Sequence, residues 1–409
     1  MSRSDAMQLF RDSFAAKTLE LNLSRKGLKD SMINSASNFE AFWHYIEKMA
    51  VDEALLFVKM KAIHSSHVFG AGTDILESMR EAAETNPDGL AMTNDENILK
   101  GLTNKQTFEI VKKYMADYEF ALMGHDIGRC FEHDDKGTPN FKLHPYLSFQ
   151  NTPQLSDVAR LAIINHGYPT AGDMYAKLDS RDEAVQASCS KGHAEWMKTL
   201  QLEAHEKYQA MTYEQKIATA LISNMVRDAD KLGNWRGVVA WGQQEDTPTM
   251  RRIYDLPHGR KGTIALADSE MRAARENRVI NYYKDCTNFN GMNLAVLMWS
   301  ADFSLQSTSQ TAAKSNLALD LINYMDEWSR QHAAEDKKSE EYAQFLKQLG
   351  EIFNIFQERG FIGSKDKFDI AERMKTYMQF ESGKLKFPIL SGDGINKYKK
   401  MEVESQFSK

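Results

Sequence analysis

Apolar residues recur at the spacing of an α-helix in several long segments of this 409-residue chain, and this spacing limits the fold more than any other feature. It is clearest in residues 42–49, 155–162, 217–232 and 345–356. Alternation typical of β-strands is rare, and the best candidate for a strand is the short run of residues 262–266. No proline lies between Pro257 and Pro388, and a proline inside a helix costs about 3 kcal/mol. These observations predict an all-α fold.

The composition describes an ordinary folded protein. Apolar residues make up 42% of the chain and charged residues 26%. Because the net charge is −6 and non-specific nucleic-acid binding needs an excess of Lys and Arg, we expect no such binding, although a small basic pocket for one phosphate fits this charge. The three cysteines, Cys130, Cys189 and Cys286, form no CxxC pair, so we expect reduced thiols and no thiolate zinc site.

The chain shows no sign of a membrane or secretory segment. Residues 1–23 lack the apolar core of a secretory signal. No uncharged apolar run approaches the roughly 20 residues that span a bilayer. We therefore expect a soluble, cytoplasmic protein without membrane partners, and export through another kind of signal stays open.

Changes in composition suggest three parts. We expect an N-terminal helical segment (1–40), a core that carries the motifs described below (41–240) and a C-terminal helical region (241–409). Two polar stretches within the core, near 80–106 and 170–192, are interpreted as insertions or loops. Within the C-terminal region, the apolar stripe of residues 345–356 is interpreted as core; a surface for homo-oligomers is the alternative.

A His-Asp doublet carries the clearest chemical signal. His125 and Asp126 follow an apolar helical run and put a neutral nitrogen ligand beside a hard carboxylate. Adjacent residues on a helix point about 100° apart, so both side chains reach one ion, or bridge two, only at a helix end. The nearby Gly124 and Gly128 allow a backbone or a ligand to come close. The doublet is therefore a candidate metal site.

Further histidines and an aspartate surround the doublet in a known order. The chain resembles the HD superfamily of metal-dependent phosphohydrolases, whose pattern is a single His, then His-Asp, then often two more His, then a distal Asp. The matching positions are His64, His125, Asp126, His144, His166 and Asp230. The resemblance covers about residues 40–240 and implies an HD-domain helical core with a C-terminal helical extension. Residues 241–409 carry no recognised motif.

The ligand types are consistent with this resemblance. Four His and two Asp without a thiolate suit Mn, Fe, Co, Ni or Zn better than Mg or Ca. Six ligands exceed one tetrahedral zinc site and suffice for two divalent ions bridged by Asp126. Some superfamily members hold one ion and have no role for the residues equivalent to His144 and His166, so occupancy by one ion stays open.

Two ligand positions have a close competitor in the sequence. His67 shares a helix face with His64, and Asp228 flanks the same apolar stripe as Asp230. The family register favours His64 and Asp230. It leaves His67 as a core residue or a residue behind the ligands, and Asp228 as a solvated carboxylate or one behind the ligands.

Cations near the doublet are candidates for binding phosphate. Arg129 takes the position at which many superfamily members carry Lys, and it can bind a phosphate oxygen or form a structural ion pair. Lys231 and Arg236 flank Asp230 and extend the basic rim. His133 is a candidate general acid for the leaving group, with a solvated loop histidine as the alternative. A looser group, Arg251, Arg252, Arg260 and Lys261, either reaches over the site or lies in a solvated loop.

The resemblance implies hydrolysis of a nucleotide or another small phosphorylated metabolite by a metal-activated water, with Asp126, Arg129 and His133 as catalytic residues. The signatures of the cyclic-dinucleotide, alarmone and triphosphohydrolase branches are incomplete here, so the sequence does not name the substrate. Two alternatives stay open. One is a di-iron oxygenase, because a branch of the superfamily uses the same ligand order. The other is a non-catalytic metal-binding regulator.

Overall fold

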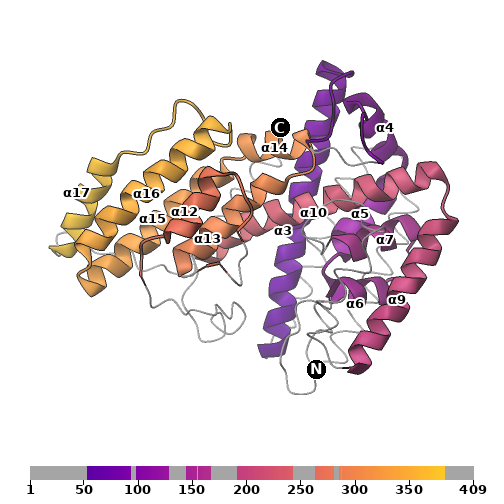
Figure 1. Ribbon diagram of the computed structural model, residues 1–409, viewed down its shortest axis with the longest axis horizontal. Coiled ribbons are helices and arrows are strands. Elements are labelled where there is room, and N and C mark those ends of the chain that lie inside the picture. The colour runs from indigo at the N-terminus through magenta and orange to yellow at the C-terminus, as the bar shows by residue number, and fades with distance from the viewer. Residues whose placement is uncertain are drawn as a thin grey trace. The chain divides into compact units, whose positions relative to one another are not determined.

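The computed structural model describes residues 53–93, 98–128, 144–153, 155–166, 191–242, 263–280, 285–286 and 288–382 (Figure 1). Within these ranges the regular elements are helices joined by turns and irregular segments, and no strand is formed. The chain divides into two compact units. The first contains the residues up to Gly233 together with Ser304–Thr308, and the second contains Asn234–Phe303 and the residues from Ser309 onward.

The first unit is built around α5 and α7. α7 packs against α5, α6 and α9, and α3 packs against α4 and α5. Local sequence explains where two of these helices begin: Ser156 caps α7 by accepting a hydrogen bond from Ala159 N, and Thr103 forms a capping box with Gln106 at α4. The helices are α3 (Glu53–Thr85), α4 (Asn104–Lys113), α5 (Met115–Gly124), α6 (His144–Gln150), α7 (Asp157–Asn165), α9 (Lys191–Ala210) and α10 (Tyr213–Gly242), the last belonging to this unit up to Gly233.

A short piece of the C-terminal sequence completes the first unit. We call Ser304–Thr308 the crossing segment. On one side it meets residues 91–93: Thr93 N donates to Ser304 O at 2.9 Å and Gln306 N donates to Ala91 O at 2.9 Å. On the other side the Asp228 carboxylate on α10 accepts from Ser304 N at 2.9 Å and from Thr308 Oγ1 at 2.8 Å. The crossing segment therefore joins α10 to the loop after α3.

In the second unit, α15 is central. It packs against α13, α16 and α17, while α12 packs against α13 and α16. The apolar stripe of residues 345–356 is buried on α16, which confirms its interpretation as core. The elements are α12 (Asp268–Arg275), α13 (Phe289–Leu297), the 3₁₀ helix η2 (Met298–Asp302), α14 (Gln306–Lys314, which begins in the crossing segment), α15 (Leu317–Asp336), α16 (Ser339–Glu358) and α17 (Ile370–Glu381).

One buried carboxylate ties three helices of the second unit together. The Tyr342 hydroxyl donates to Asp326 Oδ1 at 2.6 Å, and Arg373 Nη1 donates to Asp326 Oδ2. Arg373 Nη2 also donates to Asn323 Oδ1 at 2.7 Å. We call these four residues the Asp326 network. Each carboxylate oxygen of Asp326 has a donor, as buried polar groups normally do.

The expectation of an all-α fold is confirmed for the described ranges, and residues 155–162, 217–232 and 345–356 are helical or lie largely within helices. The strand expected at 262–266 is wrong for its described part. Ile264 and Leu266 are buried and alternate, but their backbone N–H groups donate to the side chains of Glu341 and Gln348 on α16 and pair with no strand. Residues 42–49 lie outside the described residues.

The polar stretch at 80–106 is only partly a loop. Its first residues continue α3 to Thr85, and its last residues begin α4 at Asn104. The stretch at 170–192 lies outside the described residues up to 190. The boundary between the two units lies after Gly233, whereas the sequence suggested a boundary after residue 240. The crossing segment belongs to the first unit although it follows this boundary in the chain. Among the described helices, none is long and apolar enough to cross a membrane.

Candidate metal centre

The doublet lies where α5 ends. Nearly all residues of α5 are buried, because most of its side chains are apolar. The C-terminal end of α5 therefore lies in the interior, and His125, its C-cap residue, is fully buried. His125 Nδ1 lies 2.8 Å from the carbonyl oxygen of Leu122. Because a carbonyl can only accept, Nδ1 carries the proton and Nε2 presents a lone pair to the neighbouring ligands. The doublet lies at the end of α5, which is the position that lets two adjacent side chains reach one ion or bridge two.

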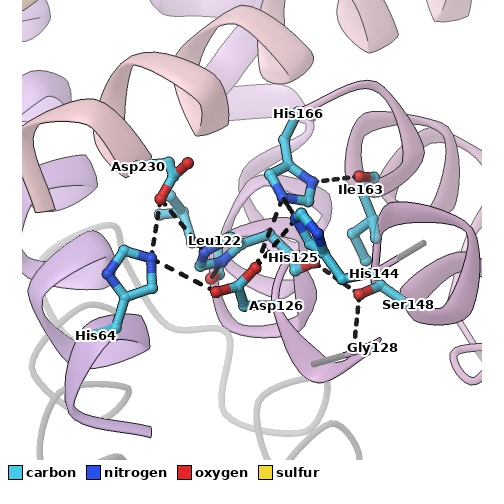
Figure 2. Close-up of polar contacts among 10 residues, drawn as sticks. All are labelled: His64, Leu122, His125, Asp126, Gly128, His144, Ser148, Ile163, His166 and Asp230. Carbon is cyan, nitrogen blue, oxygen red and sulfur yellow. Dashed lines mark hydrogen bonds and ion pairs between the residues drawn. The ribbon is translucent and has the colours of Figure 1, made fainter. Parts of the chain in front are cut away.

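His64 on α3 and Asp230 on α10 approach the doublet from one side (Figure 2). His64 Nε2 lies 2.9 Å from Asp230 Oδ1 and 3.6 Å from Asp126 Oδ2. Gly233, one turn beyond Asp230, lets α10 come close to α3, since a Cβ there would lie 2.6 Å from Val68 Cγ2. The close approach of the two helices brings the first histidine and the last aspartate of the motif together.

His144 and His166 approach from the other side (Figure 2). His144 begins α6 and His166 ends α7, and their Nε2 atoms lie 3.1 Å apart. His166 Nδ1 donates to the carbonyl oxygen of Ile163 at 2.5 Å, which leaves its Nε2 as an acceptor. His144 Nε2 therefore donates to His166 Nε2 in this arrangement.

Asp126 lies between the two sides. Its Oδ2 faces His64, whereas its Oδ1 lies 3.3 Å from His144 Nε2 and 3.8 Å from His166 Nε2. Two groups of ligand atoms form around it, each with its atoms within 4.8 Å of one another: His64, His125 and Asp230, and His125, Asp126 and His166. This arrangement of nitrogen and carboxylate donors could hold one divalent transition metal, or two that share Asp126.

The electrostatics of the cluster suit metal binding. Burial lowers the pKa of His125 to about 3, so its imidazole is neutral at neutral pH. Burial alone would raise the pKa of Asp230, but the hydrogen bond and the charge of His64 outweigh it and hold that pKa well below its usual range. His125 Nε2 is buried and makes no hydrogen bond. A nitrogen lone pair in this state fits a metal ion, because buried polar atoms otherwise find partners.

His67 and Asp228, the alternatives to His64 and Asp230 in the sequence, lie outside the groups of candidate ligands. Among the described residues, the groups able to hold an ion include His64 and Asp230, and neither His67 nor Asp228 belongs to them. His67 is buried. Asp228 is fully buried and binds the crossing segment, so its interpretation as a solvated carboxylate is wrong.

The candidate phosphate-binding residues are only partly described. Arg129, His133 and the basic residues 251–261 lie outside the described residues. Lys231 is buried. Burial raises the pKa of Asp228 above its usual value, and the charge of Lys231 offsets part of this rise. Arg236 lies on the part of α10 that belongs to the second unit. Substrate binding by Lys231 and Arg236 stays a prediction.

Sequence reasoning missed the groups that orient the ligands. The carbonyls of Leu122 and Ile163 each lie three residues before a ligand histidine at a helix end, a spacing that was visible in the sequence. Ser148 on α6 binds the backbone around the doublet, and no motif signals it.

No protein-family model, curated protein or solved structure matches this chain.

Proposed function

We propose that this protein is an HD-type metal-dependent phosphohydrolase that acts on a nucleotide or another small phosphorylated metabolite. The observation that carries the proposal is the position of Asp126, whose two carboxylate oxygens face different sets of histidines. A carboxylate placed in this way suits a site for two ions.

Each ligand has a part in this proposal. His64, His125 and Asp230 would hold one ion, His144 and His166 would hold the other, and Asp126 could contribute to both. The ions would supply Lewis acidity, which activates water as a nucleophile and offsets phosphate charge. Buried imidazoles orient the site because their Nδ1–H groups are fixed by carbonyls, as they are at His125 and His166.

The remaining roles concern the substrate. Arg129, Lys231 and Arg236 bind phosphate oxygens, whose charge needs cations close by. His133 donates a proton to the leaving group. These roles rest on the sequence and on the resemblance to the HD superfamily.

The test separates hydrolysis from oxygenation. The purified protein is stripped of metal, reloaded with Mn or Zn, and incubated under nitrogen with a panel of nucleotides and sugar phosphates. We expect release of phosphate or of a nucleoside monophosphate, with a rate that increases with pH as the attacking water ionises. Asp126→Ala serves as the inactive control.

Two outcomes would overturn the proposal. Turnover that requires iron and air and stops under nitrogen would identify an oxygenase. Full metal loading without turnover of any phosphorylated compound would favour a metal-binding regulator.

A further inference from the structure

A single buried hydroxyl joins α6 to the backbone around the doublet. Ser148 Oγ donates to the carbonyl oxygen of His125 at 2.7 Å and accepts from Gly128 N at 2.8 Å. Figure 2 shows both contacts, whose partners flank Asp126 in the chain. Ser148 is fully buried. One side chain thus satisfies two backbone groups that the end of α5 leaves without helical partners.

The same turn touches the backbone of α6 directly. A Cβ on Gly128 would lie 2.1 Å from the carbonyl oxygen of His144 and 2.6 Å from Ser148 N. Only a glycine allows the turn that follows Asp126 to come so close to the residue that begins α6. The distance between Asp126 and His144 is therefore set by this contact and by the two hydrogen bonds of Ser148.

We propose that Ser148 is a positioning residue for the two-ion site. It holds the turn that carries Asp126 against α6, so that Asp126 Oδ1 stays within reach of His144 and His166. The inference rests on the proposed function, because it assigns Ser148 to the geometry of that site. Two of the three residues proposed for the other ion, His64 and Asp230, come from α3 and α10, and in the described part of the chain Ser148 makes no hydrogen bond to either helix. The third, His125, has its imidazole held separately by the hydrogen bond from Nδ1 to the carbonyl oxygen of Leu122. Loss of its hydroxyl should therefore affect the ion at His144 and His166 more than the ion at His64.

The chain offers a matched control on the next turn. Thr152 is also fully buried, and its hydroxyl donates to the carbonyl oxygen of Ser148 at 2.8 Å and not to the turn after Asp126. Thr152→Val and Ser148→Ala each remove one buried hydroxyl from the same end of the first unit. A general loss of packing would affect the two variants alike.

A second variant tests the contact from the opposite side. Gly128→Ala keeps Ser148 but places a methyl group against the carbonyl oxygen of His144, which forces the turn and α6 apart. If the spacing matters, this variant should show the same selective loss as Ser148→Ala. Gly128→Ala also tests the contact between the turn and α6 if Ser148→Ala does not fold.

The experiment measures binding of Mn to the full-length protein by calorimetric titration and elemental analysis. Electron paramagnetic resonance then distinguishes coupled pairs of Mn ions from isolated ions. For the unaltered chain we expect two bound ions with a coupled signal. For Ser148→Ala and Gly128→Ala we expect one tightly bound ion, an isolated-ion signal, and a second ion weakened about 10- to 100-fold, the range for residues that orient ligands. Thr152→Val should behave like the unaltered chain.

Three results would overturn the inference. They are an unchanged second ion in both Ser148→Ala and Gly128→Ala, equal weakening of both ions, or the same loss in Thr152→Val. If the unaltered chain binds one ion and hydrolyses phosphate, the inference fails and a one-ion hydrolase remains. If it binds no ion, the proposed function fails as well.

Discussion

The candidate metal-ligand cluster of the first unit and the Asp326 network of the second both bury carboxylates, but they differ in how many of their polar atoms have hydrogen-bond partners. In the Asp326 network, each carboxylate oxygen receives a hydrogen bond, from Tyr342 and from Arg373. In the ligand cluster, four imidazoles crowd around two carboxylates, and His125 Nε2 makes no hydrogen bond. A network in which every polar atom is paired stabilises a fold, whereas the unpaired nitrogen at the centre of the histidine cluster is available to a ligand.

The largest expected effect comes from the centre of the ligand cluster. Asp126→Ala should remove bound metal and reduce phosphohydrolase activity far more than about 100-fold, which is the upper range for residues merely behind the ligands. Metal content is measured on protein purified without chelator. His205→Ala changes an exposed histidine of α9 and should leave metal and activity unchanged. Full metal content in Asp126→Ala would show that the cluster does not depend on its central carboxylate.

The second effect concerns the complete network. Asp326→Ala should lower the free energy of unfolding by about 3 kcal/mol, because it removes the acceptor of Arg373 Nη1 and of the buried Tyr342 hydroxyl. Urea unfolding followed by circular dichroism measures this loss. The exposed pair between Arg275 and Glu351 provides the comparison, since Glu351→Ala should cost less than about 1 kcal/mol.

The same variant separates the two regions. Metal content in Asp326→Ala should equal that of the unaltered chain. A variant that unfolds no more easily, or that loses metal in proportion to its stability, would contradict the distinction between a structural network and a ligand site.

A third effect follows from completing the ligand cluster. Divalent metal at about 100 times its dissociation constant should stabilise the protein by about 2.7 kcal/mol, because the unfolded chain lacks the assembled site. Thermal unfolding with Mn and with a chelator measures the shift. We expect the shift to be kept in Asp326→Ala and abolished in Asp126→Ala. An equal shift in both variants would place the stabilising ion elsewhere.

The smallest effect concerns the thiol of Cys286 in the second unit. We expect this buried thiol to be unreactive while the protein is folded. Cys286 is buried, and burial together with the nearby Glu270 raises the pKa of its thiol to about 12. Because the thiolate is the reactive form, Cys286 should resist alkylation at pH 8 until urea unfolds the chain. Peptide mapping by mass spectrometry distinguishes Cys286 from Cys130 and Cys189. Rapid labelling in native buffer would mean that this region opens readily.

The local spacing of apolar residues predicted many of the helices, but it predicted few of the contacts between residues far apart in the sequence. The helical spacing of apolar residues predicted α7, α10 and α16. Only α16 buries a single apolar face, whereas α7 and the middle of α10 are buried on all sides. The same spacing could not choose between Asp228 and Asp230. The choice depends on the partners of Asp228, which lie 76 to 80 residues later in the chain.

The order of the candidate ligands was visible in the sequence. The residues that hold the backbone around them, such as Ser148, were not. The six positions of the motif come together in the structure. Ser148 carries no motif, because a serine on a short helix is common and only the folded turn shows what its hydroxyl binds. The alternation at 262–266 misled for a related reason: an irregular segment whose backbone binds helix side chains can alternate in burial as a strand does.

The crossing segment has a consequence for how the chain is made. When α10 has left the ribosome, the carboxylate of Asp228 still lacks the backbone donors of Ser304 and Leu305, which are translated 76 and 77 residues later. A buried carboxylate without donors is costly, so the nascent first unit cannot settle around α10 at that stage. We therefore expect the histidine cluster to assemble, and to load any metal, only after the crossing segment has been translated. A chain cut after α10 would retain every ligand in its sequence and still be unable to hold them in place.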